Sequence, residues 1–198
     1  MSTHVPDRAG PTRAETQLGK TILDGEALGR TLSRIAHEII ERNDDLDAVA
    51  LVGIRTRGVP LAERLAELIE ERSGTEVALG AVDITFHRDD RARTADQPVV
   101  TATELDFDLE GTTCVLVDDV LYTGRTIRAA IETLFEHGRP ARVQLAVLVD
   151  RGHRELPIRP DYVGKNLPTS RSERIQVQLV EIDGSDSILL VDAPEEDS

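Results

Sequence analysis

Two adjacent acids, Asp118 and Asp119, follow an apolar run, and a Thr-Gly-Arg-Thr turn begins at Thr123, four residues after the second acid. Carboxylates at the end of a buried strand can accept hydrogen bonds from ribose hydroxyls. The turn can hold a phosphate with backbone N–H groups, two hydroxyls and the positive end of a following helix. Gly124 lets the backbone approach such an anion closely. The spacing therefore predicts a sugar-phosphate site.

Residues 114–126 resemble the phosphoribosyl pyrophosphate (PRPP) motif of type I phosphoribosyltransferases, with apolar residues, two acids, a short spacer and a phosphate turn in that order. The resemblance implies that the acids hold the ribose 2′ and 3′ hydroxyls and that residues 123–126 hold the 5′-phosphate. Tyr122 departs from the small residue common at its place. An ordinary strand end and helix N-terminus would explain the apolar run but not the turn. The expected nucleotide-binding residues of this loop are Asp118, Asp119, Val120, Leu121, Tyr122, Thr123, Gly124, Arg125 and Thr126.

A second loop, residues 53–58, carries two arginines between two glycines. Guanidinium groups and exposed N–H groups can bind pyrophosphate, although a basic surface turn would read the same way. No Lys-Ser/Thr follows the second glycine, which disfavours a P-loop NTPase. Its place before the acidic loop matches the pyrophosphate loop of the phosphoribosyltransferases. The resemblance assigns to it Arg55, Thr56, Arg57 and Gly58.

Two further segments gain a role from the resemblance. The loop after residues 142–149 would cover the nucleobase, with backbone groups of Val149, Asp150 and Arg151 reading a uracil edge. The charged segment 86–110 would be a hood that closes over PRPP and excludes water, the alternative being a disordered surface excursion. The hood residues singled out are Arg88, Asp89, Asp90 and Arg91.

Displacement of pyrophosphate from the anomeric carbon needs Mg²⁺ and arginines on the leaving group, a fixed ribose and exclusion of water. Mg²⁺ takes oxygen ligands and keeps several waters. We therefore expect PRPP itself to hold the ion, with Asp118 and Asp119 assisting through water. No nucleophilic side chain is required of the protein. No Ser-His-Asp grouping or Cys/His metal spacing is recognisable in the sequence.

Composition narrows the class of protein. The formal net charge is −14, from 23 basic and 37 acidic side chains, which argues against a nonspecific nucleic-acid binder but leaves room for a local basic face. The one cysteine, Cys114, lies in an apolar run and reads as a core residue. No apolar run approaches the roughly 20 residues of a membrane span, and no signal-peptide segment is evident. These features predict a cytoplasmic protein.

Residues 34–43, 83–90 and 144–159, together with Tyr122, are similar to the PyrR family of pyrimidine operon regulators. The resemblance implies uracil phosphoribosyltransferase activity, binding of pyrimidine-operon leader mRNA that tightens with UMP or UTP, and a homodimer or higher homo-oligomer. Between residues 151 and 174 six basic and three acidic side chains leave about +3, a local surface of the kind that phosphate contacts need. The implied RNA-binding residues are Ser33, Arg34, His37, Arg42, His153, Arg154, Arg159 and Lys165.

Three alternatives stay open on the sequence: a salvage enzyme with an idle regulatory face, a regulator that keeps the PRPP site as a nucleotide sensor, and a purine phosphoribosyltransferase. The intact loops at residues 55–58 and 118–119 weigh against the sensor. The PyrR-like stretch after Val149 disfavours the purine enzyme.

The elements that must position these loops alternate along the chain. Helical spacing of apolar residues predicts helices over 25–42, from Pro60 to 73–74, and over 124–137. Apolar runs predict strands at 48–54, 77–84, 113–117 and 142–149, with shorter strands near 175–182 and 187–191. This order predicts an α/β type I phosphoribosyltransferase fold, a mostly parallel sheet covered by helices on both faces, with ligands beyond the carboxyl ends of its strands. We expect a disordered segment at 1–19, one domain over 20–192 and a frayed tail at 193–198.

Overall fold

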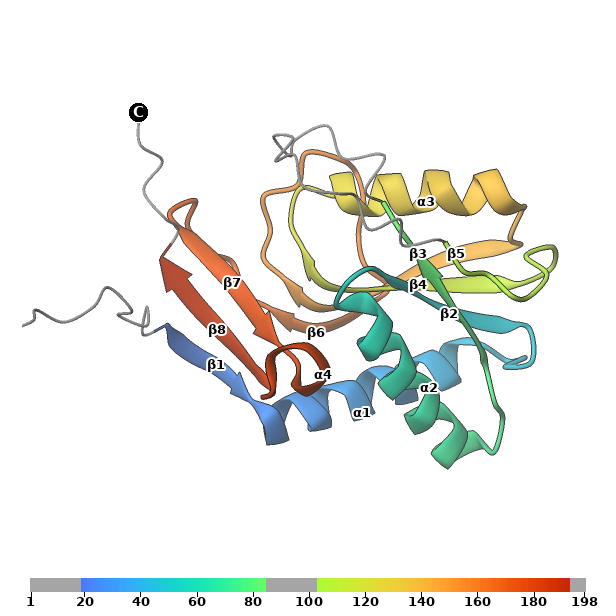
Figure 1. The fold of residues 1–198 in the computed structure, drawn as a ribbon, viewed down its shortest axis with the longest axis horizontal. Coiled ribbons are helices and arrows are strands. Elements are labelled where there is room, and N and C mark those ends of the chain that lie inside the picture. The colour runs from blue at the N-terminus through green and yellow to red at the C-terminus, as the bar shows by residue number, and fades with distance from the viewer. Residues whose placement is uncertain (1–18, 85–102, 193–198) are drawn as a thin grey trace, which may run out of the picture.

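The computed structural model describes residues 19–84 and 103–192, so the predictions for residues 1–18, for the hood at Arg88 to Arg91 and for the tail 193–198 lie outside the described residues. Its central sheet has five parallel strands in the order β3-β2-β4-β5-β6 (Figure 1). The strands are β2 (Val49–Ile54), β3 (Ala78–Val82), β4 (Thr113–Leu121), β5 (Arg142–Asp150) and β6 (Tyr162–Asn166).

Helices cover both faces of this sheet, as the unbroken apolar strands predict. α1 (Gly25–Arg42) and α2 (Gly58–Ser73) pack on one face and α3 (Arg125–His137) on the other (Figure 1). Successive residues of β4 alternate between the two cores: Val115 and Val117 face α1 and α2, whereas Cys114 and Leu116 face α3. Burial raises the pKa of the Cys114 thiol to about 11, so this side chain packs as a small apolar group.

A second sheet, antiparallel and three-stranded, lies beside the first, in the order β1-β8-β7 (Figure 1). It joins β1 (Lys20–Asp24) to β7 (Glu173–Gln178) and β8 (Ser187–Asp192), and the short helix α4 (Val180–Asp183) connects the last two. The sequence analysis predicted neither β1 nor α4, and its strand near 175–182 was too long at its C-terminal end. β1 is mostly exposed and short, so its pairing with a strand more than 160 residues away leaves no local pattern.

Two element boundaries bear directly on the site and correct the sequence analysis. β4 does not end at Val117 but continues through both acids to Leu121, with Asp118 opposite Val147 and Val120 opposite Val149. The sequence pattern did not predict this extension because Asp118 and Asp119 interrupt the apolar run. Pairing with the neighbouring strand β5 continues the strand through them. Similarly, β6 lies in a stretch that was assigned to a loop.

In residues 19–84 and 103–192, no helix combines the length and apolarity needed to cross a bilayer.

Candidate functional site

Two glycines bring the arginine loop against the end of β4. A Cβ on Gly58 would lie 2.2 Å from the carbonyl oxygen of Val117, and a Cβ on Gly53 would lie 2.5 Å from the Cα of Val59. Any side chain at either position would push α2 away from the sheet. The glycines therefore place residues 55–58 beside residues 118–126, at the same carboxyl edge of neighbouring parallel strands.

The two arginines of this loop are partly buried and each has an acidic partner. Arg55 pairs with Glu104 at 3.0 Å, and Arg57 pairs with Asp183 at 2.9 Å. The Nε atoms of both arginines are buried without a hydrogen-bond partner in the described part of the chain. The Arg55–Thr56 peptide bond is cis. A pyrophosphate site requires positive charge and N–H donors that can bind the phosphate oxygens, and these two guanidinium groups can supply both.

Asp118 and Asp119 each accept a hydrogen bond from the next backbone N–H. Asp119 N lies 3.0 Å from Asp118 Oδ1, and Val120 N lies 2.8 Å from Asp119 Oδ1. Burial raises the pKa of the Asp119 carboxyl, and the positive charge of Arg57 opposes that rise. Asp119 and the arginine loop are thus electrostatically connected.

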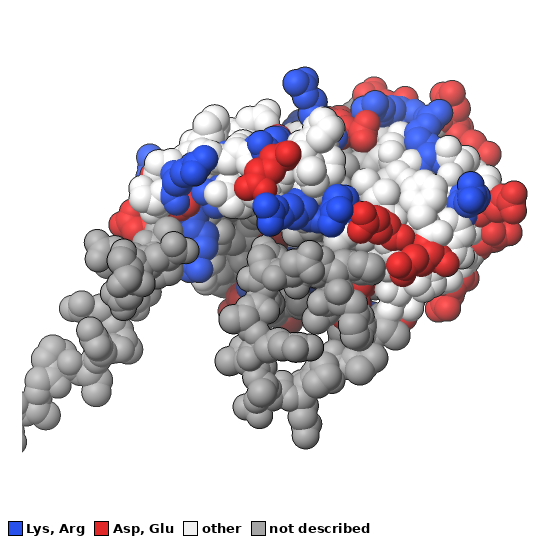
Figure 2. Space-filling model, turned by 90° about the horizontal axis from the view of Figure 1, so that it is seen from above, with Lys and Arg blue, Asp and Glu red and all other residues white. Residues whose placement is uncertain are grey.

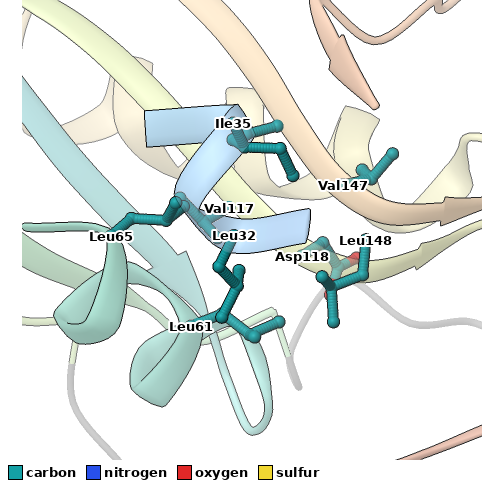
Figure 3. A pocket seen from close by; sticks show the side chains of 9 residues that line it. Leu32, Ile35, Leu61, Leu65, Val117, Asp118, Val147 and Leu148 are labelled. Atoms are coloured by element: carbon teal, nitrogen blue, oxygen red, sulfur yellow. The ribbon is translucent and has the colours of Figure 1, made fainter. Parts of the chain in front are cut away.

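A small cavity lies between α1, α2 and the strands β4 and β5 (Figure 3). Its described lining is apolar apart from Asp118. A cavity of this composition has no groups for a charged sugar phosphate. Its contribution is to keep water from the inner side of Asp118, which is only 8% exposed.

The phosphate turn is held by the loop after β5. The carbonyl oxygen of Thr123 accepts hydrogen bonds from the backbone N–H groups of Glu155 (3.0 Å) and Leu156 (3.2 Å). Gly124 has φ 94°, a left-handed conformation that places it just before the first turn of α3. Arg125 pairs with Glu155 at 2.8 Å, but both side chains are exposed. Two segments that are 30 residues apart therefore fix one turn.

Arg154 joins the same two loops through its guanidinium group. Its Nη1 donates to the carbonyl oxygen of Tyr122 at 2.7 Å, its Nε donates to that of Ile158 at 3.0 Å, and its Nη2 pairs with Asp150. The side chain is only 21% exposed. These contacts lie within the chain, and the predicted binding of RNA by Arg154 stays a prediction.

Tyr122 packs against Arg151 and His153 in the loop after β5. The guanidinium carbon of Arg151 lies 4.1 Å from the centroid of the Tyr122 ring, and the His153 ring meets it edge-on at 5.8 Å. Arg151 also donates to Thr169 Oγ1 (3.0 Å) and to the carbonyl oxygen of Glu173 (2.9 Å).

The predicted base-reading residues are largely occupied by contacts within the chain. Val149 is fully buried, and the Arg151 N–H donates to the carbonyl oxygen of Leu121 at 3.1 Å. One Asp150 oxygen accepts from Gly152 N at 2.9 Å. Base recognition by these three residues therefore stays a prediction.

The predicted RNA-binding residues of α1 lie along β6. Arg34 donates to the carbonyl oxygens of Val163 (2.8 Å) and Gly164 (2.7 Å) and also pairs with Glu38. Arg42 pairs with Asp161 at 2.9 Å.

The other predicted RNA-binding residues differ in how they are engaged. His37 lies 3.4 Å from Glu41, and Ser33 accepts a hydrogen bond from Arg72. Arg159 and Lys165 are exposed, and their side chains have no hydrogen bond or ion pair within the described residues. On the face seen in Figure 2, Lys and Arg side chains are interspersed with acidic ones, and acidic side chains line the right-hand rim.

Sequence reasoning missed the acids and hydroxyls that hold the functional side chains in place. These are Glu104, Glu155, Asp161, Thr169 and Asp183. They lie in loops or short elements with no motif of their own, so the only available signal is three-dimensional.

This fold and this arrangement of loops define a phosphoribosyltransferase. Residues 19–182 match the family described as phosphoribosyl transferase domain, and the chain belongs to that family. Solved hypoxanthine phosphoribosyltransferases share the fold at 17% identity: one from Staphylococcus aureus has a TM-score of 0.67 over 88% of this chain and 92% of that chain. One from Trypanosoma cruzi has a TM-score of 0.68 over 91% of this chain and 94% of that chain. The predicted fold class is confirmed.

Within this class the chain belongs to the PyrR family. It is 59% identical over 167 residues to the "Bifunctional protein PyrR" of Clostridium acetobutylicum, and the match covers 84% of this chain and 94% of the relative. It is also 59% identical over 173 residues to the protein of the same name from Roseiflexus sp., with 87% of this chain and 94% of the relative covered. The family resemblance drawn from the sequence is confirmed.

Proposed function

We propose that this protein is bifunctional: it transfers the phosphoribosyl group of PRPP to uracil, giving UMP and pyrophosphate, and it regulates pyrimidine-operon expression by binding leader mRNA in response to UMP or UTP. Its membership of the PyrR family supports both activities. The observation that carries the enzymatic one is the close packing of the arginine loop against the end of β4, which sets Arg57 beside Asp119.

In the transfer, the bond between the anomeric carbon and the pyrophosphate oxygen breaks, a bond from that carbon to N1 of uracil forms, and uracil loses its N1 proton. Arg55 and Arg57 stabilise the negative charge that develops on the pyrophosphate. Asp118 and Asp119 hold the ribose hydroxyls, so that the anomeric carbon keeps its position as its bonds change. The turn from Thr123 to Thr126 holds the 5′-phosphate.

Mg²⁺ bound to PRPP would supply further charge neutralisation at the leaving group. The described residues contain no group of three or more His, Cys, Asp or Glu side chains able to form a protein metal site. Asp118 and Asp119 would instead assist a hydrated ion held mainly by PRPP, because carboxylate oxygens accept hydrogen bonds from metal-bound water.

The enzymatic proposal is tested by following UMP formation from PRPP and uracil, with hypoxanthine as the competing base. Formation of UMP without IMP is the expected result. A product from hypoxanthine alone would instead make the chain a purine enzyme. No product from either base, in a preparation that binds UMP, would leave a nucleotide sensor.

The regulatory proposal rests on the surface formed by α1, β6 and the loop after β5. Its expected contacts are Ser33, Arg34, His37, Arg42, His153, Arg154, Arg159 and Lys165. Arg154 also holds the loop after β5, which carries His153 and Arg159. Phosphate contacts release counterions, so binding should weaken as salt rises. Binding of the protein's own leader RNA, measured with and without UMP across a salt series, should tighten with UMP. Affinity equal to that for an unrelated RNA would leave a salvage enzyme.

We further propose, from the family resemblance, that the protein is cytoplasmic and forms a homodimer or higher homo-oligomer. Size-exclusion chromatography with light scattering would test the assembly, and a mass equal to one 21.7 kDa chain would contradict it.

A further inference from the structure

The C-terminal sheet is joined to α2 and its preceding loop by two groups of ion pairs. Arg57 pairs with Asp183 at the end of α4, and Arg64 pairs with Glu181 and Asp186. Both arginines thus contact the same short region of the C-terminal sheet from neighbouring positions. The two groups of pairs differ in how completely the arginine is engaged.

Arg64 uses all three of its guanidinium nitrogens in hydrogen bonds to its acidic partners. Its Nε, Nη1 and Nη2 atoms all donate to Glu181 or Asp186, at 2.6 to 2.9 Å. These hydrogen bonds lower the pKa values of both carboxyls, which is the behaviour of a structural ion pair. Arg64 lies more than one turn beyond the start of α2, and four of its five guanidinium N–H donors are taken by the two carboxylates.

Arg57 is only partly committed. Its Nη2 donates to both oxygens of Asp183, at 2.9 and 3.2 Å, and its buried Nε has no partner within the described residues. Its charge also acts on Asp119, so it lies between the ribose acids and α4. Arg57 therefore faces a site for an anion while one edge of its guanidinium group is held by Asp183.

Asp183 is itself fixed. Its Oδ2 accepts a hydrogen bond from the backbone N–H of Leu179 at 2.9 Å, and its side chain is 22% exposed. A carboxylate held in this way restrains the orientation of the guanidinium group that it contacts. An arginine without such a partner must lose its side-chain freedom each time that an anion binds.

We infer that Asp183 is a positioning residue for the pyrophosphate end of the site: it holds Arg57 so that the remaining guanidinium donors meet the leaving group. This inference rests on the proposed phosphoribosyl transfer. It also makes docking of the C-terminal sheet on α2 a condition for efficient use of PRPP, although no residue of that sheet need touch the substrate.

The test compares Asp183→Ala with Glu181→Ala, which removes an ion pair between the same two regions but leaves Arg57 untouched. Loss of positioning should lower kcat/KM for PRPP about tenfold in Asp183→Ala, with a matching rise in the inhibition constant for pyrophosphate. The KM for uracil should stay within about twofold, because the base does not contact Arg57. Glu181→Ala should retain kcat/KM for PRPP within about twofold.

A double-mutant cycle separates positioning from general stability. In an Arg57→Ala background, Asp183→Ala should cause no further loss, because its only route to the substrate is gone. The inference is overturned by equal losses in Asp183→Ala and Glu181→Ala, or by a full further loss in the Arg57→Ala background. Should Asp183→Ala melt below the assay temperature, Asp183→Asn keeps the shape and gives the same comparison.

Failure of the proposed function has a different signature. If the wild-type protein makes no UMP, the transfer itself is wrong, and calorimetric titration with pyrophosphate then shows whether Asp183 still positions an anion-binding arginine. If the wild type makes UMP and Asp183→Ala has unchanged constants for PRPP and pyrophosphate, only the inference about Asp183 fails.

Discussion

The proposed nucleotide edge, formed by the loops at residues 55–58 and 118–126 and the loop after β5, and the proposed RNA surface both depend on cationic side chains. These side chains differ in how exposed they are. At the nucleotide edge Arg57 and Arg154 are 33% and 21% exposed, and each is fixed by contacts from another part of the chain. On the RNA surface Arg34 and Arg42 also contact distant segments, but they are 47% and 51% exposed, and Lys165 has no partner within the described residues. A small substrate in chemical transformation needs charges fixed in advance, whereas a flexible polyanion can displace weak surface partners.

The largest expected effect is at the nucleotide edge, in Asp119→Asn. Loss of the carboxylate should lower kcat/KM for UMP formation more than about 100-fold. Affinity for RNA without nucleotide should stay within about twofold, since the residue lies outside the RNA surface. Steady-state assays and RNA titrations measure the two effects. Retained activity would mean that Asp118 alone holds the ribose.

The same variant has a pH-dependent effect on stability. Burial raises the pKa of Asp119 in the folded state, so the folded protein binds this proton more tightly than the unfolded chain. Ionised Asp119 therefore opposes folding at neutral pH, and the penalty disappears as the pH falls below its unfolded pKa. Asp119→Asn should raise the melting temperature by about 2–4 °C at pH 7 and by less at pH 4. A lower melting temperature at pH 7 would contradict this explanation.

Arg154 tests the comparison because the sequence assigned it to one region and its contacts assign it to the other. Arg154→Lys keeps the charge but cannot reproduce the donors to Tyr122, Ile158 and Asp150. UMP formation should fall about tenfold, because the phosphate turn loses support. The matched variant Arg159→Lys should leave it unchanged. A loss confined to RNA binding would return Arg154 to the RNA surface.

Arg159 and Lys165 should behave in the opposite way. In the double variant Arg159→Ala and Lys165→Ala, the slope of log affinity against log salt should fall by about 1.4, or about 0.7 for each lost contact with single-stranded RNA. UMP formation should not change. Arg128→Ala, an exposed cation on α3, is the control and should leave the slope unaltered. An unchanged slope in the double variant would remove this part of the surface from the RNA contact.

The smallest expected effect concerns the partner of an α1 cation. Glu38→Gln removes the acid that pairs with Arg34, while the two hydrogen bonds from Arg34 to β6 remain. RNA affinity should rise about two- to threefold, as expected for an exposed ion pair that the phosphate must displace. Filter binding at low salt measures the change. Weaker binding would mean that Glu38 orients Arg34 rather than competing for it.

The elements that local pattern determines were predicted well. The limits of α1 follow from its apolar spacing, and Pro60 and Gly74 mark the first turn and the end of α2. The apolar runs of β2 and β5 predicted buried parallel strands. Both candidate phosphate loops could be predicted because their glycines, hydroxyls and arginines are adjacent in the sequence, and their binding roles stay predictions.

What the tertiary structure decided is the set of contacts between distant segments. Arg57 meets Asp183 across 126 residues, and β1 finds β8 at the other end of the chain. Arg154 is indistinguishable from Arg159 in composition, but only the former turns inward to the carbonyl oxygens of the nucleotide loop. By itself the sequence determined which groups could do the chemistry, because that information is local. Which of those groups are fixed and which are free depends on packing between segments far apart, and only the folded chain supplies it.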